Sequence, residues 1–194
     1  MIVFIDRQHA GKPDKLNDRG ATVDCDHDGS PDMEAMITAR LAIQLEQLLM
    51  LHGHMVMPIS DGTYTQRHKR VNEYAAMYPN EHCIYLAMHL NAGGGTYGAF
   101  FHHHASAQGA TLATHIGRQM MQNNIDITDC KTIAAHPEGW TKNAFYTIRG
   151  VGRPVALCCE PVFMDSPRGK LDNITLARIA DAMATGIHQY FLEL

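Results

Sequence analysis

The sequence lacks any hydrophobic run long enough to cross a membrane. Its longest apolar stretches, such as residues 155–159, fall far short of the ~20 residues that a transmembrane helix needs, so we expect no membrane insertion. Neither sign of charge dominates, because 16 lysines and arginines against 20 aspartates and glutamates give a net charge of −4. This balance argues against nucleic acid or an anionic membrane as the main partner.

Cysteine is scarce and follows no ligand pattern. The five cysteines are an odd number without C-x-x-C spacing, which disfavours a disulfide framework or a cysteine zinc site and favours free thiols in a reducing compartment. The first six residues lack the basic segment and the small-residue cleavage site of a secretory signal. We therefore expect synthesis in the cytoplasm without a signal peptide, and action outside the cell only after release.

Strand-like apolar runs alternate with helical spacing along the chain. Strands are expected at 1–6, 55–59, 83–88, 98–102, 145–148 and 155–159. One helix should start at Ser30–Pro31 and stop at Gly53, and others should span 65–77, 108–122 and 173–191, with irregular segments at 7–30 and 124–142. No repeat or linker divides residues 1–194, so the pattern predicts a single α/β domain. Its mostly parallel, twisted sheet should have about six strands and helices on both faces.

Thirteen histidines are the outlier in composition, and they direct attention to metals and acid–base chemistry. Four polar residues stand where strands end or helices begin, the places where open α/β sheets gather functional groups: His9, Glu34, His89 and Glu160. Two histidines and a carboxylate around one Zn²⁺, with a coordination position left for water, form the usual arrangement of a hydrolytic site.

Glu34 is the most informative of the four because it shares a helical stripe with four apolar residues: Ile37, Leu41, Leu45 and Leu48. Its carboxylate should therefore face inward. An unpaired ionised carboxylate in such a place costs several kcal/mol, so it must meet a cation, a basic side chain or strong hydrogen-bond donors.

Each candidate taken singly also has an ordinary structural interpretation. His9 could be a simple loop histidine, and Glu34 could favour the positive end of the helix dipole. Glu160 could form a salt bridge with Arg149 or Arg153.

The order of the motifs resembles a known enzyme family. The matching elements are Ile2-Val3-Phe4-Ile5, Asp6-Arg7-Gln8-His9-Ala10-Gly11, Glu34, Arg70-Val71-Asn72, His89-Leu90-Asn91-Ala92, Arg149 and Pro154 to Glu160. This order is similar to that of the zinc-dependent N-acetylmuramoyl-L-alanine amidases of the amidase-3 family, from residue 2 to the last helix. The resemblance implies a zinc-exopeptidase-like fold and one Zn²⁺ held by His9, Glu34 and His89, with Glu160 as the catalytic acid/base.

The chain departs from the family pattern at a few places. Arg7, Gln8 and Ala10 stand in an opening motif that is usually Asp-Pro-Gly-His-Gly, and Ala87 replaces a common serine. The spacing from His9 to Glu34 is longer than expected of the family, which leaves Asp28 or Asp32 as an alternative third ligand. None of these changes removes a metal-binding atom from the four key positions.

Other motifs favour structural interpretations. Asp24-x-Asp26-x-Asp28-Gly29 copies the start of a calcium loop, but the bidentate carboxylate that position twelve requires is out of register, so we expect a polar loop. His102 to His104 alternate across a strand and cannot enclose one ion, which predicts an exposed strand end. Cys158 and Cys159 should behave as small hydrophobes rather than nucleophiles.

Three more residues have open roles. Asp6 either orients the imidazole of His9 or caps the loop, and Trp140 either lines a groove or packs. Arg149 is a candidate contact for the peptide carboxylates of a substrate.

The resemblance implies peptidoglycan as the substrate, cut at the amide between the lactyl group of N-acetylmuramic acid and L-alanine. A phage-type endolysin released through a holin and the catalytic domain of a bacterial autolysin both fit, with a monomer favoured. A zinc carboxypeptidase on the same scaffold is one alternative. A cell-wall-binding module with an impaired metal site is another.

Overall fold

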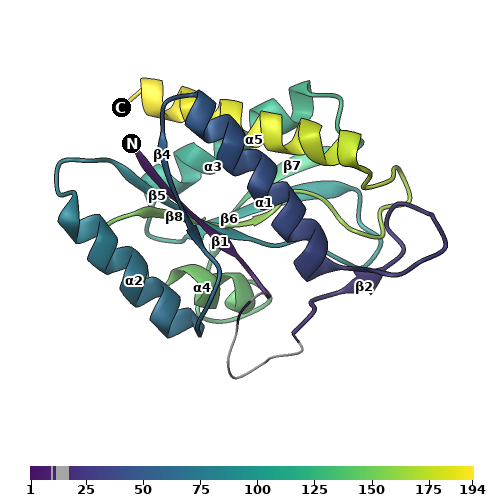
Figure 1. The fold of residues 1–194 in the computed structure, drawn as a ribbon, viewed down its shortest axis with the longest axis horizontal. Coiled ribbons are helices and arrows are strands. Elements are labelled where there is room, and N and C mark those ends of the chain that lie inside the picture. The colour runs from purple at the N-terminus through teal and green to yellow at the C-terminus, as the bar shows by residue number, and fades with distance from the viewer. Residues whose placement is uncertain (10, 12–17) are drawn as a thin grey trace.

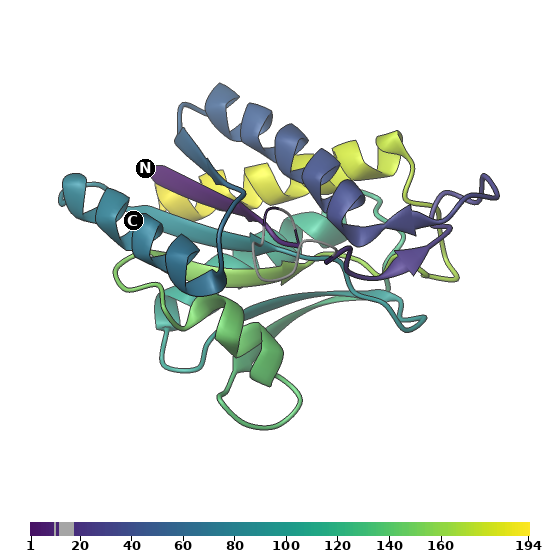
Figure 2. The same ribbon diagram turned by 60° about the horizontal axis from the view of Figure 1, so that its bottom comes forward.

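Six strands form one sheet that lies between two layers of helices (Figures 1 and 2). The structure is a computed structural model and describes residues 1–9, 11 and 18–194. The strands of the sheet, in spatial order, are β4 (Met55–Ile59), β1 (Ile2–Arg7), β5 (Cys83–Met88), β8 (Val155–Glu160), β6 (Tyr97–His103) and β7 (Asp129–Ala135). Two short strands, β2 (Thr22–Val23) and β3 (Asp32–Met33), pair as a separate ribbon.

Most neighbouring strands are parallel, as predicted. β4, β1, β5 and β8 run in the same direction, whereas β6 pairs antiparallel with β8 and parallel with β7. The carboxyl ends of β1, β5 and β8 therefore meet at one edge of the sheet. His9 and His89 follow β1 and β5, and Glu160 is the last residue of β8. All three residues therefore lie at that edge.

The two faces of the sheet have separate apolar cores. α1 (Glu34–Leu51), α3 (Ala107–Gln122) and α5 (Asn173–Leu192) cover the face that carries Val3 and Ile5. α2 (Tyr64–Met77) and α4 (Lys142–Ile148) cover the face that carries Ile2 and Phe4. This alternation follows from the two-residue period of a strand buried on both sides. The single α/β domain with five helices in its described part is the predicted fold class.

Two elements in the second half of the chain were predicted wrongly. Residues 145–148 lie in α4, where Ala144, Phe145, Thr147 and Ile148 are buried at helical spacing. Residues 129–135, expected to be irregular, form the edge strand β7, most of which is not buried. A short aromatic and β-branched run does not distinguish a strand from a buried helical turn, and an edge strand carries little apolar signal.

The start of α1 was also predicted wrongly. The helix begins at Glu34, not at Ser30–Pro31, and Met33 is its N-cap. Asp32 and Met33 pair instead with β2, so sheet pairing overrides the local capping signal. The other predicted elements lie within one or two residues of the observed ones. The predicted loop 7–30 includes β2, and Ala10 with residues 12–17 lies outside the described residues.

No helix in the described ranges combines the length and apolar character needed to span a bilayer.

Candidate metal centre and active site

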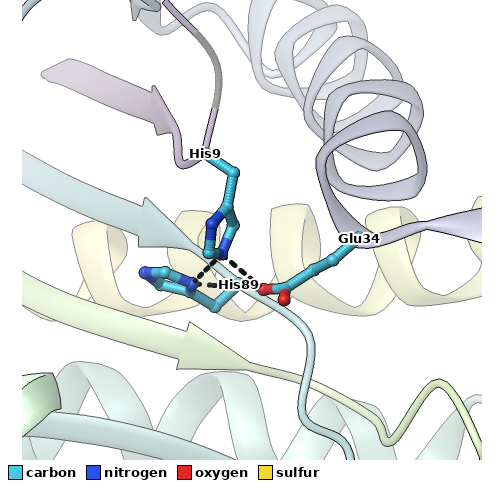
Figure 3. Close-up of side chains that lie close together, drawn as sticks. All are labelled: His9, Glu34 and His89. Carbon is cyan, nitrogen blue, oxygen red and sulfur yellow. Dashed lines mark hydrogen bonds and ion pairs between the residues drawn. The ribbon is translucent and has the colours of Figure 1, made fainter. Parts of the chain in front are cut away.

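Three side chains from separate elements converge at the carboxyl edge of the sheet (Figure 3). His9 follows β1, Glu34 opens α1 and His89 follows β5. His9 Nε2 lies 3.0 Å from Glu34 Oε1 and 3.1 Å from His89 Nδ1. His89 Nδ1 lies 3.2 Å from Glu34 Oε1, so the three ligand atoms form a small triangle.

The fold holds each of these side chains in place. Glu34 is buried, and its two carboxylate oxygens accept hydrogen bonds from the backbone N–H groups of Ala21 and Leu90, at 3.0 and 3.1 Å. The backbone N–H of His89 donates to the carbonyl of Cys159, which ties the residue after β5 to β8. His9 has a φ of 66°, a left-handed conformation that non-glycine residues rarely adopt and that clusters at functional sites.

The three donor atoms fit a divalent cation. Two imidazole nitrogens 3.1 Å apart share at most one proton, and a carboxylate oxygen beside them adds a third electron pair. Four-coordinate zinc at about 2.0–2.1 Å from nitrogen or oxygen places its ligand atoms about 3.3 Å apart, close to the spacing seen here. Burial alone would raise the pKa of Glu34, but its contacts with His89 and His9 bring that pKa well below its usual range. The carboxylate is thus held in its charged form.

Glu160 lies beside these three residues in the same cavity. The cavity has a volume of about 480 Å³ and is lined by His9, Asp18, Glu34, Tyr64, His89, Leu90, Asn143, Ala144, Tyr146, Thr147, Cys158 and Glu160. Burial, together with the negative charge of Glu34, raises the pKa of Glu160 to about 7. A carboxyl group with such a pKa takes up and releases protons near neutral pH, as a general acid/base must.

The sequence profile of the Amidase_3 family, described as N-acetylmuramoyl-L-alanine amidase, matches residues 3–189. The chain belongs to this family. None of the curated protein sequences compared with the chain matches it.

Solved amidase structures share the Amidase_3 fold of this chain. AmiC2 of Nostoc punctiforme is 19% identical with a TM-score of 0.73, covering 99% of this chain and 97% of its own. The catalytic domain of CwlV from Bacillus (Paenibacillus) polymyxa var. colistinus is 20% identical with a TM-score of 0.68, covering 98% and 97%. The catalytic domain of the CD27L endolysin, which targets Clostridia difficile, is 18% identical with a TM-score of 0.65, covering 96% of each chain.

In this Amidase_3 chain, Asp18 rather than Asp6 contacts His9. Asp18 Oδ1 lies 2.8 Å from His9 Nδ1, on the opposite side of the ring from Glu34. Asp6 points to the other face of the sheet, where it accepts hydrogen bonds from Arg67 and Tyr85. The interpretation of Asp6 as a partner of His9 is therefore wrong. Nothing in the sequence signalled Asp18, because it lies in a long loop without periodicity.

The alternative third ligands do not reach the two histidines. Asp32 Oδ2 accepts from the backbone N–H and the thiol of Cys25, and Asp28 Oδ1 accepts from the N–H of Ser30. Asp24, Asp26 and Asp28 lie close together, and their carboxylates accept backbone N–H groups of the same loop. The loop is polar as predicted. Because its three carboxylates offer oxygens within 4.8 Å of one another, the expectation that it holds no calcium stays a prediction.

Neither arginine named as a partner of Glu160 pairs with it in the described structure. Arg153 donates to the carbonyls of Ala75 and Tyr78 at the end of α2. The Arg149 guanidinium lies 4.1 Å from the centre of the Tyr146 ring, outside the cavity lining. Its role as a contact for substrate carboxylates stays a prediction.

The predictions for the 102–104 histidines and for the cysteines had different outcomes. His102 is buried, so the expectation of a wholly exposed 102–104 strand end is wrong for that residue. The five cysteines are free, and burial raises the pKa of Cys158 and Cys159, as expected of inert thiols.

The cavity residues of α4, Asn143 and Tyr146, were missed because this segment was not expected to be helical.

Proposed function

We propose that the protein is a zinc-dependent N-acetylmuramoyl-L-alanine amidase that hydrolyses the amide between the lactyl group of N-acetylmuramic acid and L-alanine in peptidoglycan. The observation that carries the proposal is the convergence of His9 Nε2, Glu34 Oε1 and His89 Nδ1 within 3.2 Å of one another, in one cavity with Glu160. Membership of the Amidase_3 family also supports cleavage of this amide bond.

Each residue has a distinct task in the proposed reaction. His9, Glu34 and His89 would hold one Zn²⁺, which when bound supplies the Lewis acidity that makes water nucleophilic near neutral pH. The Glu160 carboxylate accepts a proton from the attacking water. The same carboxyl group then returns the proton to the L-alanine nitrogen as the C–N bond breaks.

Other cavity residues position these groups. Asp18 accepts a hydrogen bond from His9 Nδ1–H, which leaves Nε2 with a free electron pair for the metal. Asn143 lines the cavity, and its amide offers hydrogen bonds to the polar groups around the scissile amide.

The products of digestion distinguish the amidase from the carboxypeptidase alternative. Purified sacculi treated with the protein should release stem peptides with a free L-alanine amino terminus. Release of single amino acids would support a carboxypeptidase and contradict the proposal.

The variant Glu160→Gln tests the assignment of the base. We expect kcat on sacculi to fall by at least about 100-fold, because general acid–base catalysis contributes roughly 10²–10⁴-fold. Zinc content should stay at one equivalent. Exposed Glu73 on α2, changed to Gln, is the matched control and should keep full activity.

His89→Ala tests the ligand set and the wall-binding alternative together. We expect this variant to lose bound zinc and lytic activity, as measured by elemental analysis and sacculus turbidity. A wild-type protein with substoichiometric zinc and wall binding indifferent to chelator would instead support a binding module with an impaired site. A full equivalent of zinc in the variant would refute the ligand assignment.

For the cellular setting, we propose synthesis in the cytoplasm and action on the wall after release, as for a phage endolysin. Buried free thiols such as Cys158 and Cys159 suit a reducing compartment. Co-expression with a pore-forming holin should cause rapid lysis, whereas expression of the protein alone should not. Lysis without the holin would point to export and to an autolysin.

A further inference from the structure

We propose that the exposed ring of Trp140 is a glycan-binding contact that extends the catalytic cavity. This inference rests on the proposed function and names the part of the polymer that binds outside the cavity. The expected ligand is the N-acetylated sugar chain of peptidoglycan, whose C–H faces pack on aromatic rings.

Trp140 is the only tryptophan of the chain, and 75% of it is exposed. Its ring makes an edge contact with Phe101 on β6, with centroids 5.9 Å apart. Large aromatic side chains contribute strongly to interfaces when a ligand buries them. Trp140 is available for such a contact because it is exposed and lies in the loop that leads into the cavity-lining helix α4.

The loop that carries Trp140 is held at both ends. The backbone N–H of His136 donates to Thr141 Oγ1 at 3.0 Å, and the N–H of Lys142 donates to the carbonyl of Gly139. Gly139 has a φ of 76°, the left-handed conformation that favours glycine. These contacts restrain the loop, so placing a ligand on the ring costs little conformational entropy. In Figure 2 the loop leading into α4 protrudes from the lower side of the molecule.

The position of Trp140 along the chain connects it to the cavity. It lies two residues before the start of α4, and Asn143 and Ala144, three and four residues after it, line the cavity with Glu160. The amide that the proposed enzyme cuts joins sugar to peptide. A substrate with this amide at Glu160 must therefore place its glycan next to the cavity wall, and α4 is one such wall.

Stacked imidazoles lie on the same side of the sheet, at the end of β6. His103 stacks on His104 with centroids 4.4 Å apart, and His104 stacks on His136 at 4.8 Å. His103 also contacts Phe145 of α4. Ring faces that pack on sugar C–H groups, together with imidazole nitrogens that bond hydroxyl and acetamido groups, suit a sugar chain better than a peptide.

The single tryptophan makes the direct test specific. Intrinsic fluorescence of the full wild-type protein is titrated with peptide-free glycan strands, which it cannot hydrolyse, and separately with free stem peptide. We expect a saturable change with the glycan strands and none with the stem peptide. A response to the stem peptide alone, or to neither ligand, would overturn the proposal.

Kinetics test whether the contact serves the reaction. For Trp140→Ala we expect KM on sacculi to rise about three- to tenfold, the range of one aromatic contact, with kcat unchanged. On a minimal muramoyl-peptide with one sugar, KM should not change. Trp140→Tyr should restore most of the affinity, and Tyr74→Ala, which removes an exposed aromatic ring on α2, should have no effect. An unchanged KM of Trp140→Ala on sacculi would refute the proposal.

The outcomes separate this inference from the proposed function. If the wild type binds glycan strands but does not hydrolyse sacculi, the proposed function fails and the glycan contact stands. If the wild type hydrolyses sacculi and Trp140→Ala has the same KM on sacculi, the glycan contact is refuted while the proposed function stands.

Discussion

Glu34 occupies a core-facing position of α1 because its carboxylate has partners on every side. Backbone N–H groups of Ala21 and Leu90 bond to it, and His9 and His89 contact one of its oxygens. Without such partners, a buried carboxylate would destabilise the helix end. The same environment affects Glu160, whose pKa rises because it is buried near the charge of Glu34.

The titration of Glu160 is a prediction at the residue scale. In metal-free protein its carboxyl group should lose its proton around pH 7, because burial disfavours the charged form. A cation bound at the neighbouring site should lower this midpoint, since it favours the carboxylate. Carbon NMR of the glutamate carboxyl groups, with Glu160→Gln to assign the signal, measures both values. A midpoint near 4 in metal-free protein would contradict the prediction.

Asp18→Asn tests the support of His9. The amide presents a weaker acceptor to His9 Nδ1, so we expect zinc affinity to fall about 10- to 100-fold, the usual effect of losing such a partner. Competition with a chromophoric chelator measures it. Asp61→Asn, which changes an exposed carboxylate paired with Arg70, is the control and should leave affinity unchanged.

At the scale of elements, α2 is attached to β1 by a fully buried ion pair. Arg67 of α2 donates to Asp6 of β1, and the Tyr85 hydroxyl donates to the other Asp6 oxygen at 2.5 Å. Arg67 also donates to the carbonyl of Gly62 at 2.7 Å. These contacts hold α2 and the loop before it beside the end of β1, from which His9 extends.

Arg67→Met should destabilise the protein strongly. Removing one partner leaves Asp6 buried with its charge uncompensated, a change that costs about 3–5 kcal/mol. Urea denaturation measures the free energy of unfolding. Arg70→Met, on the same helix but in an exposed pair with Asp61, should cost less than about 1 kcal/mol. Equal losses for the two variants would contradict the assigned role of the buried pair.

At the scale of the whole molecule, three histidines join α1, β4 and α5 at the edge of the sheet opposite the candidate site. His188 Nδ1 lies 3.2 Å from His54 Nε2, and His52 stacks on His188 with centroids 4.5 Å apart. Burial, with the nearby charges of His188, the N-terminus and His52, lowers the pKa of His54 from 6.5 to about 4. The packing around His54 therefore favours the neutral form of its imidazole.

Stability should consequently fall in mild acid. A histidine whose pKa is lower in the folded state contributes stability above its unfolded pKa, and loses that contribution as pH falls toward the folded value. Between about pH 6.5 and pH 4 we expect a loss of up to about 3 kcal/mol from His54. Urea denaturation of metal-free wild type and His54→Phe should show a smaller loss in the variant. Exposed His82→Phe is the control, and equal losses in all three would contradict the prediction.

The accuracy of prediction followed the strength of the local pattern. Strongly apolar β1, β5 and β8 and the periodic α1, α3 and α5 were predicted to within a few residues, because burial on one or two faces imposes a readable period. β7 is an edge strand with polar side chains, and α4 is a seven-residue helix, so neither has a pattern long enough to read. The N-terminus of α1 was misplaced because pairing of β3 with β2 is a non-local interaction.

The sequence by itself determined the α/β class, the inward face of Glu34, and the placement of His9, His89 and Glu160 where strands end, because these depend on local periodicity. Only the tertiary structure decided that residues 9, 34 and 89 meet within 3.2 Å, that Asp18 contacts His9, and that α4 completes the cavity. These distances depend on the order of the strands in the sheet and on the path of the loops between them, and no local pattern encodes either.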